Sequence, residues 1–296
     1  MLFFEPPSIL TNAEMLNIKQ WLSIKRIILS IALGLLIISG VYGVWIEPYQ
    51  IDVKHVTINN ETISTALKDK IAVHLSDLHI NKIGKREKQI LKLIEDLNPD
   101  LIFLTGDYVK WCGDYESALS FLSELKAPMG VWAVMGDYDY SSSRKSCLFC
   151  HKQGSGNPTR KHHVRFLRNE AECISLSNGD AWLQGIDPEA ELNYRYDTEK
   201  NLLEQKIPAI ILSHDPLMFN SIANDRDVLI LAGDTHGGQI PLPRWLWNIM
   251  GYEKNFRFNH GFFHEGHKMM YVSRGIGSSH LPIRLLRPPE LVVLHF

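Results

Sequence analysis

Five short apolar segments of the chain are each followed at once by side chains that can bind a metal ion. The segments are residues 71–76, 101–105, 131–135, 209–213 and 228–232. The side chains that follow them are, in the same order, Asp77 and His79, Asp107, Asp137, His214, and Asp234 with His236. Buried strands of a layered α/β domain read as apolar runs of this length, and their carboxyl ends carry the chemistry. The pattern therefore predicts that these residues converge in one site.

The segments between these ends predict helices and further strands. Residues 71–75 and 101–104 read as strands on either side of an amphipathic helix over residues 86–97, and Pro99 marks the break before the second strand. We also expect a helix over residues 115–125 and strands over residues 131–135 and 291–295. Alternating strands and helices of this kind indicate the α/β class.

A mixed set of carboxylates and imidazoles suits two hydrolytic divalent ions, of manganese, iron, magnesium or zinc. One Asp-x-His or Gly-Asp motif would be weak evidence, because each is frequent by chance. Five such ends in order are much stronger evidence, against the alternative that these side chains are only solvated loop residues. The glycines before three of the aspartates allow the sharp turns that this arrangement needs.

The order of these motifs resembles the signature of the calcineurin-like metallophosphoesterases, D-x-H, G-D, G-N-H-[D/E], H and G-H-x-H. Within that superfamily the chain resembles the membrane-anchored branch related to UDP-2,3-diacylglucosamine pyrophosphatases and transmembrane metallophosphoesterases. The resemblance covers roughly residues 27–296, and the segments 237–239, 271–277, 281–284 and 288–290 also fit it. It implies a layered α/β/β/α sandwich and a two-metal enzyme that cleaves a phosphodiester or pyrophosphate bond.

The resemblance also implies roles for single residues. One metal ion would be held by Asp77, His79, Asp107 and His236. The second would be held by Asp107, Asp137, His214 and Asp234. Asp107 would thus bridge both ions, and a hydroxide between them would attack phosphorus.

Three positions depart from the pattern. Asp137 replaces the Asn of the family, Tyr138 replaces its His, and Asp234 replaces the first His of the last motif. Both new carboxylates can still coordinate a cation, and together with Asp77 and Asp107 they raise the number of anionic ligands from two to four. An oxygen-rich second site favours a harder ion such as Mn²⁺, Mg²⁺ or Fe³⁺ over Zn²⁺.

Tyr138 stands where the family's His would protonate the leaving group. A phenol with an ordinary pKa of about 10 is a poor acid at neutral pH. A nucleoside phosphate is a good leaving group and needs little protonation, so the replacement favours a pyrophosphate substrate. Arg274 and Arg284 are candidate phosphate clamps, and a purely structural role is the equal alternative for both.

Residues 27–46 form a run of 20 residues without one charge, flanked by Trp21 and Trp45. At about 1.5 Å per residue a helix of this length crosses a bilayer, so it predicts a membrane anchor. A buried core helix and a cleaved signal peptide are the alternatives. Residues 1–26 would then be a cytoplasmic segment, residues 47–70 a linker with a short strand, and residues 71–296 the metallophosphoesterase domain. Three cations precede the run and only Lys54 closely follows it, which favours an exported domain, periplasmic or extracellular.

Residues 141–163 form an insertion that the resemblance does not explain. Cys147, Cys150 and His151 match the C-x-x-C-H pattern of c-type haem attachment, with His162 or His163 as the second axial ligand. A zinc site made by both cysteines and two of these histidines, or a disulfide, are the alternatives. The insertion motivates a second hypothesis, that the chain is a non-hydrolytic haem- or metal-binding redox or sensor module.

The charge of the whole chain excludes one class of partner. The formal net charge is −2, so no basic field attracts nucleic acid. The expected partners are the lipid bilayer and a phosphorylated small molecule or lipid as substrate.

Overall fold

The computed structural model describes residues 12–110, 113–139, 162–176, 179–186 and 209–296. The chain divides into two compact units, residues 1–42 and residues 43–296. The second unit holds all the strands that the structure describes.

The first unit consists of most of a long helix, α1 (Asn12–Trp45). Its apolar side chains, such as those of Ile28, Leu29 and Leu36, are exposed to solvent. This is not the pattern of a core helix, which buries its apolar face. In the described part of the chain, this is the one helix that is long and apolar enough to cross a membrane, and it contains nearly all of the predicted run 27–46.

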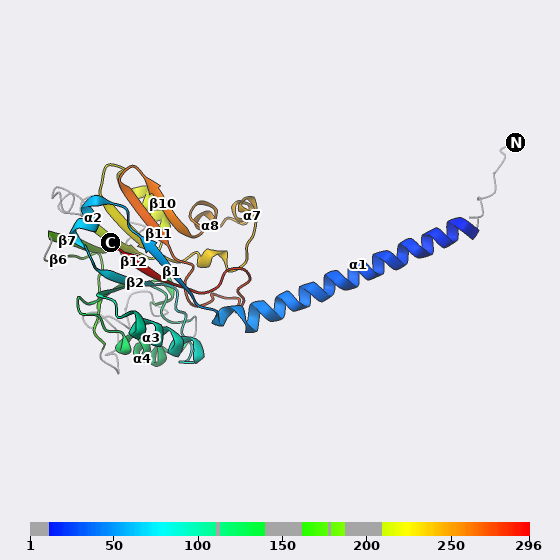
Figure 1. The fold of residues 1–296 in the computed structure, drawn as a ribbon, viewed down its shortest axis with the longest axis horizontal. Helices are drawn as coiled ribbons and strands as arrows, with labels where there is room; N and C mark the ends of the chain where they lie inside the picture. Colours follow the sequence, from blue (N-terminus) through cyan, green and yellow to red (C-terminus); the bar gives the residue numbers. More distant parts are fainter. Residues whose placement is uncertain (1–11, 111–112, 140–161, 177–178, 187–208) are drawn as a thin grey trace. The chain divides into compact units, whose positions relative to one another are not determined.

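The second unit is built on two sheets of six strands each (Figure 1). The first sheet has the spatial order β1 (Asp52–Thr57), β12 (Glu290–His295), β2 (Ile71–Leu75), β3 (Leu101–Thr105), β4 (Val131–Val134) and β5 (Val164–Phe166). Its strands pair in parallel, except that β12 is antiparallel to β2. The second sheet has the order β10 (Gly261–Glu265), β11 (Lys268–Val272), β9 (Val228–Ala232), β8 (Ala209–Ser213), β7 (Gly179–Ile186) and β6 (Ala171–Leu176). Its inner strands are parallel, and the strands at both edges are antiparallel to their neighbours.

Helices and short turns connect these strands. The α-helices are α2 (Glu61–Ala66), α3 (Lys85–Leu97), α4 (Tyr115–Glu124), α7 (Arg244–Ile249) and α8 (Glu253–Arg257). Single 3-10 turns are η1 (Glu47–Tyr49), η2 (Asp137–Asp139), η3 (Pro216–Ser221) and η4 (His236–Gly238). The segment 47–70, which the sequence predicted as a linker with a short strand, thus contributes an edge strand and a helix to the domain.

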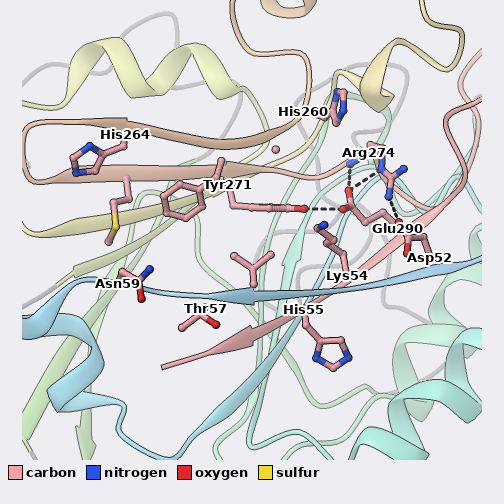
Figure 2. Close-up of a pocket in the computed structure, with 14 residues that line it drawn as sticks. Asp52, Lys54, His55, Thr57, Asn59, His260, His264, Tyr271, Arg274 and Glu290 are labelled. Carbon is pink, nitrogen blue, oxygen red and sulfur yellow. Dashed lines mark hydrogen bonds and ion pairs between the residues drawn. The ribbon is translucent and has the colours of Figure 1, made fainter.

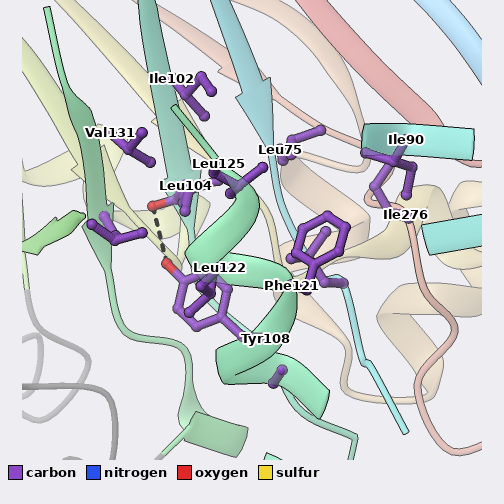
Figure 3. Close-up of a cluster of buried hydrophobic side chains, with 14 of the residues drawn as sticks. Leu75, Ile90, Ile102, Leu104, Tyr108, Phe121, Leu122, Leu125, Val131 and Ile276 are labelled. Carbon is purple, nitrogen blue, oxygen red and sulfur yellow. Dashed lines mark hydrogen bonds between the residues drawn. The ribbon is translucent and has the colours of Figure 1, made fainter. Parts of the chain in front are cut away.

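Three clusters of buried apolar side chains define the layers. The first lies between the first sheet and helices α3 and α4, where Ile90 and Phe121 pack against Leu75 and Leu104 (Figure 3). The second fills the space between the two sheets. The third covers the outer face of the second sheet, where Phe219 of η3 packs beside Ile230. Helices, two sheets and an outer cover give the layered α/β sandwich that the sequence predicted.

Candidate active site

The seven predicted metal ligands follow the ends of five strands that the two sheets bring together. Strands β2, β3 and β4 are neighbours and parallel in the first sheet, so the loops after them meet at one edge. Strands β8 and β9 are likewise parallel neighbours in the second sheet. A hydrogen bond from the backbone N–H of Asp234 to the Asp77 carboxylate, at 3.1 Å, links the ends of the two sheets.

The backbone of this edge is strained at the ligands themselves. Five of them have positive φ angles between 43° and 69°, a backbone region that residues other than glycine seldom adopt. They are Asp77, His79, Asp107, Asp234 and His236. Each such residue costs on the order of 1–3 kcal/mol, which the surrounding structure must offset. Strain concentrated on these residues indicates a functional site rather than solvated loops.

One group of ligands is centred on two imidazoles. The Nε2 atoms of His79 and His236 approach to 3.1 Å, a distance at which they share a proton or point at one bound ion. The first of them lies 3.3 Å from an Asp107 oxygen, and the second 3.4 Å from an Asp77 oxygen. Burial lowers the pKa of His79 to about 3 and lowers that of His236 well below its usual value. Both rings are therefore neutral at physiological pH, as metal ligands must be.

The second group is centred on His214. Its Nδ1 lies 2.7 Å from the backbone oxygen of Thr105, which can only accept, so Nδ1 carries the hydrogen. In the neutral ring Nε2 then offers its lone pair, the form that binds a metal ion. This Nε2 lies 3.6 Å from oxygens of Asp107 and Asp137 and 3.8 Å from one of Asp234.

The electrostatics of the site show how strongly it attracts positive charge. Burial raises the pKa of Asp77 to about 6 and raises that of the Asp107 carboxyl. Burial alone would lower the pKa of His214, yet the surrounding carboxylates raise it well above its usual value. Anionic oxygens held this close repel one another unless a cation lies between them.

These observations test whether the residues fit metal ions, and they do. The donor atoms of Asp77, His79 and His236 all lie within 4.8 Å of one another, and so do those of Asp77, Asp107 and His214. The buried Nε2 of His214 has no hydrogen-bond partner in the described part of the chain, and the donors are the carboxylates and imidazoles that divalent hydrolytic ions use. The two groups share Asp77, and Asp107 lies in contact with a histidine of each group.

Asp139 is a buried carboxylate that the sequence patterns did not single out for a role. It accepts hydrogen bonds from the backbone N–H groups of Asp107 and Tyr108, both at 2.7 Å, and from Gly136 at 2.8 Å. These groups belong to the loops after β3 and β4. Asp139 therefore holds the loop of Asp107 against the loop of Asp137.

Lys254 of α8 is a second residue that sequence reasoning missed. Its ammonium lies 2.5 Å from an Asp234 oxygen and 2.9 Å from an Asp215 oxygen. Although burial opposes the charged form, the two carboxylates raise the pKa of Lys254 above its usual value, so it stays charged. The positive charge of Lys254 thus offsets the negative charge that Asp234 brings to the site. No motif marks it, because it comes from a helix distant in sequence.

Tyr138 stands with its ring edge-on to His79, at 4.9 Å between ring centroids. Its hydroxyl lies 3.0 Å from Nε2 of His280, an exposed residue that the sequence analysis did not identify. Burial raises the pKa of Tyr138 to about 12, so the phenol is protonated at neutral pH.

The metal-binding edge opens into a cleft of about 650 Å³. Asp107, Asp137 and Asp234 line one part of it. Polar side chains such as Glu253, Lys254 and Asn255 also line it, but an apolar part of the lining comes from Leu217, Ile240, Leu242, Trp247, Met250, Leu281 and Ile283. The cleft thus joins a strongly polar site to an apolar surface.

Arg274 and Arg284 make their contacts outside this cleft. Figure 2 shows Arg274 directed at Asp52 and Glu290, 2.5 and 3.2 Å away, in a second pocket. Arg284 is buried, and its guanidinium donates to backbone oxygens, among them that of Gly277. Structural contacts therefore account for both side chains, and a phosphate clamp stays a prediction.

The C-x-x-C-H motif of the insertion, with Cys147, Cys150 and His151, lies outside the described residues. Of the two histidines at its end, His162 is buried and packs edge-on against Phe166, while His163 is exposed. The haem, zinc and disulfide hypotheses remain predictions.

A two-sheet sandwich with carboxylates and imidazoles at five strand ends defines a metal-dependent hydrolase. The family model of the calcineurin-like phosphoesterases matches residues 72–238, and the chain belongs to this family. The match spans the strand ends from Asp77 to His236 and confirms the resemblance seen in the sequence. The chain is accordingly a phosphoester hydrolase of a family that uses divalent metal ions.

Three proteins illustrate what the chain is similar to. The metallophosphoesterase YkuE of Bacillus subtilis is 28% identical over 272 residues, which cover 89% of this chain and 92% of that protein. The UDP-2,3-diacylglucosamine pyrophosphatase LpxG of Chlamydia trachomatis is 25% identical over 315 residues, covering 87% and 93%. Among solved structures, the phosphoesterase YfcE of E. coli is 12% identical with a TM-score of 0.36, covering 71% of this chain and 82% of that one.

Proposed function

We propose that the chain hydrolyses a phosphodiester or pyrophosphate bond in a lipid-linked or nucleotide substrate at the surface of a membrane. The observation that carries this proposal is the mixed lining of the cleft, which combines the carboxylates of the candidate metal site with a set of apolar side chains. Such a lining fits a molecule with a phosphorylated end and a hydrophobic end. The similarity to a pyrophosphatase that acts on a diacylated sugar nucleotide supports the same class of substrate.

The ligand groups support a division of labour within the site. Asp77, His79 and His236 would hold one ion, His214 with Asp137 and Asp234 the other, and Asp107 would contact both. Bound divalent ions would supply Lewis-acid charge and a hydroxide nucleophile. Asp139 and Lys254 act on the protein side, since the first fixes the Asp107 loop and the second partly neutralises the charge of Asp234.

The leaving group bears on the choice between a pyrophosphate and an alkyl ester. The phenol of Tyr138 holds its proton too tightly to be an efficient acid at neutral pH. A nucleoside phosphate leaves without that help, so we infer that a pyrophosphate is the preferred substrate. The hydroxyl of Tyr138, paired with His280, orients the leaving group by a hydrogen bond.

The membrane part of the proposal rests on α1. Its length, its lack of charge over residues 27–46 and its exposed apolar side chains support a single membrane span. The cations before the run favour a cytoplasmic N-terminus and an exported catalytic unit. Tethering the unit to the bilayer raises its effective concentration toward lipid substrates.

A substrate screen tests the proposal. The full chain, in detergent with Mn²⁺, is offered lipid-linked nucleoside diphosphates, soluble phosphodiesters and phosphomonoesters. We expect the highest kcat/KM on the lipid-linked pyrophosphate. The matched control is Asp107→Asn, which should lower turnover on every substrate because the carboxylate that contacts both ligand groups is lost. Preference for a soluble monoester would contradict the proposed substrate class.

A further inference from the structure

Large exposed apolar side chains gather in three short segments of the unit 43–296. Among the residues that the structure describes there, Phe262 is the one such side chain outside the segments 45–49, 245–252 and 281–286. The most exposed are Ile249, at 73%, Trp45, at 67%, and Leu286, at 66%. Single exposed apolar residues are normal, but a group of this size marks a surface for a partner or a membrane.

Hydrogen bonds fasten two of these segments together. The backbone N–H of Arg284 donates to the carbonyl oxygen of Gly43 at 2.9 Å. The buried carboxylate of Glu47 accepts from the N–H groups of Leu286, at 2.8 Å, and of Arg287. The place where the chain enters this unit is therefore held against residues 284–287.

The second and third segments both contribute to the cleft. Trp247 and Met250 of the third segment line it, and so do Leu281 and Ile283 of the second. Gln239 holds the second segment, because its carbonyl accepts from Leu285 N–H at 2.8 Å and its side-chain oxygen accepts from Ser279 N–H at 2.7 Å. The neighbouring Gly238 lies against Trp247 of the third segment, since a Cβ there would lie 2.6 Å from the Trp247 ring. The exposed Met250, Tyr252 and Leu281 line the active-site cleft itself, and the other exposed apolar side chains belong to the same segments or to the segment fastened to them.

We propose that this apolar rim, the segments 45–49, 245–252 and 281–286, dips into the surface of the bilayer that holds α1, so that the cleft opens onto the membrane. The inference rests on the proposed membrane anchoring of α1. Residues 43–45 are the last turn of that helix, so the rim begins where the chain leaves the hydrocarbon. Trp45, Tyr49, Trp245 and Tyr252 are the residue types that favour the interface between lipid and water.

This placement has a consequence for the reaction. A lipid-linked substrate reaches the metal ligands with its acyl part still in contact with apolar surface, first of the bilayer and then of Leu281 and Trp247. Such a substrate never has to expose that part to water, which is the unfavourable step in lipid extraction. A soluble ester gains nothing from the rim.

A lipid-contact experiment tests the rim on the full chain. The four native cysteines are replaced by serine, one cysteine is placed at Ile249→Cys, and it is labelled with the polarity-sensitive fluorophore NBD in vesicles of phosphatidylcholine and phosphatidylglycerol. The matched control is Asp225→Cys, an exposed residue before β9 and so at the strand end opposite to the metal ligands. We expect blue-shifted emission and quenching by spin-labelled lipid at position 249, and neither at position 225.

A second measurement keeps the native cysteines, in case the serine variant does not fold. Trp245→Phe should reduce the fraction of tryptophan fluorescence that brominated lipid quenches, and Trp182→Phe on β7 should not. The double change of Trp245 and Ile249 to Asp should lower kcat/KM on a vesicle-borne lipid pyrophosphate by about tenfold and leave a soluble ester within about twofold.

The outcomes separate the rim from the function on which it rests. In one outcome, vesicles retain the chain after alkaline extraction while the label at position 249 is as exposed to water as the label at position 225. That result would refute the proposed rim and leave the membrane anchoring of α1 intact. If the chain is washed off, the membrane part of the proposed function fails first. Protection of position 249 that depends on protein concentration and not on lipid quencher would overturn the proposal in favour of a second copy of the chain. Lipid contact without any hydrolysis would leave the rim and refute the proposed activity.

Discussion

Removal of the Asp139 carboxylate should loosen the active site more than the loss of any exposed charge. This carboxylate is fully buried and accepts three backbone hydrogen bonds of 2.7–2.8 Å, from Asp107, Tyr108 and Gly136. In Asp139→Ala these N–H groups lose their acceptor. In Asp139→Asn the volume is kept, but the amide N–H₂ faces other donors.

The magnitude follows from the three donors. A buried N–H left without a partner costs about 1–3 kcal/mol, so three give roughly 3–9 kcal/mol if no water enters. Part of the cost is recovered when water fills the space left by alanine, and about 3–6 kcal/mol remains as the expected loss. For a domain of this size each kcal/mol lowers Tm by about 2–4 °C, so Tm should fall by at least about 6 °C.

The assay is thermal unfolding of the full chain in detergent, followed by near-ultraviolet circular dichroism, with and without Mn²⁺. The control is Asp225→Ala, whose side chain is exposed and pairs only loosely with Arg226, at 3.9 Å. Mn²⁺ should raise the Tm of both Asp139 variants less than that of the native chain, because the Asp107 loop is no longer fixed. A Tm of Asp139→Ala within about 2 °C of the control would refute the reasoning.

Three further outcomes are expected. Lys254→Met should bind Mn²⁺ roughly tenfold more tightly by calorimetry, because a positive charge beside the ligands is gone, whereas the exposed Lys92→Met should not change the affinity. Tyr138→Phe, and to a similar degree His280→Ala, should slow the hydrolysis of an alkyl phosphodiester by up to about 10²-fold and that of a pyrophosphate much less. Equal losses of activity on both substrates would argue for a packing role of Tyr138. Because burial raises the pKa of Asp77 to about 6, its carboxyl keeps a proton below that pH, so the affinity for Mn²⁺ should be weak at pH 5 and rise through pH 6 to a plateau; a flat profile would show that Asp77 is not a ligand.

Strands β2, β3, β4, β8, β9 and β12 were predictable because each forms a short, nearly continuous apolar run. The predicted strands and helices from residue 71 to residue 135 match β2, α3, β3, α4 and β4 within a residue or two at each end. The hairpin of β6 and β7 was missed, because β6 is an edge strand and β7 (Gly179–Ile186) carries polar residues that interrupt the apolar run. Strand β5 has three residues, too few for any period to appear.

The metal ligands were predictable for a different reason. Each follows directly after a buried strand, so the local sequence marks it. The topology of the sheets then brings the marked residues together. Lys254 and His280 have no such local signal, since their neighbours at the site are 20 or more residues away in sequence. Asp139 lies within the motif region, yet its partners are backbone N–H groups, and the sequence cannot show which groups it faces.

Strand β12 sets the order in which the domain can be completed. It lies between β1 and β2, pairing Asp52 with Glu290 on one side and Ile71 with His295 on the other. Every other described strand is synthesised before it, so β1 has no neighbour and β2 keeps an open edge until then. A nascent chain would therefore present unpaired strand edges on β1 and β2 until residues 290–295 arrive. Closing a contact across more than 200 residues is slow, which makes this interval the stage most exposed to mispairing.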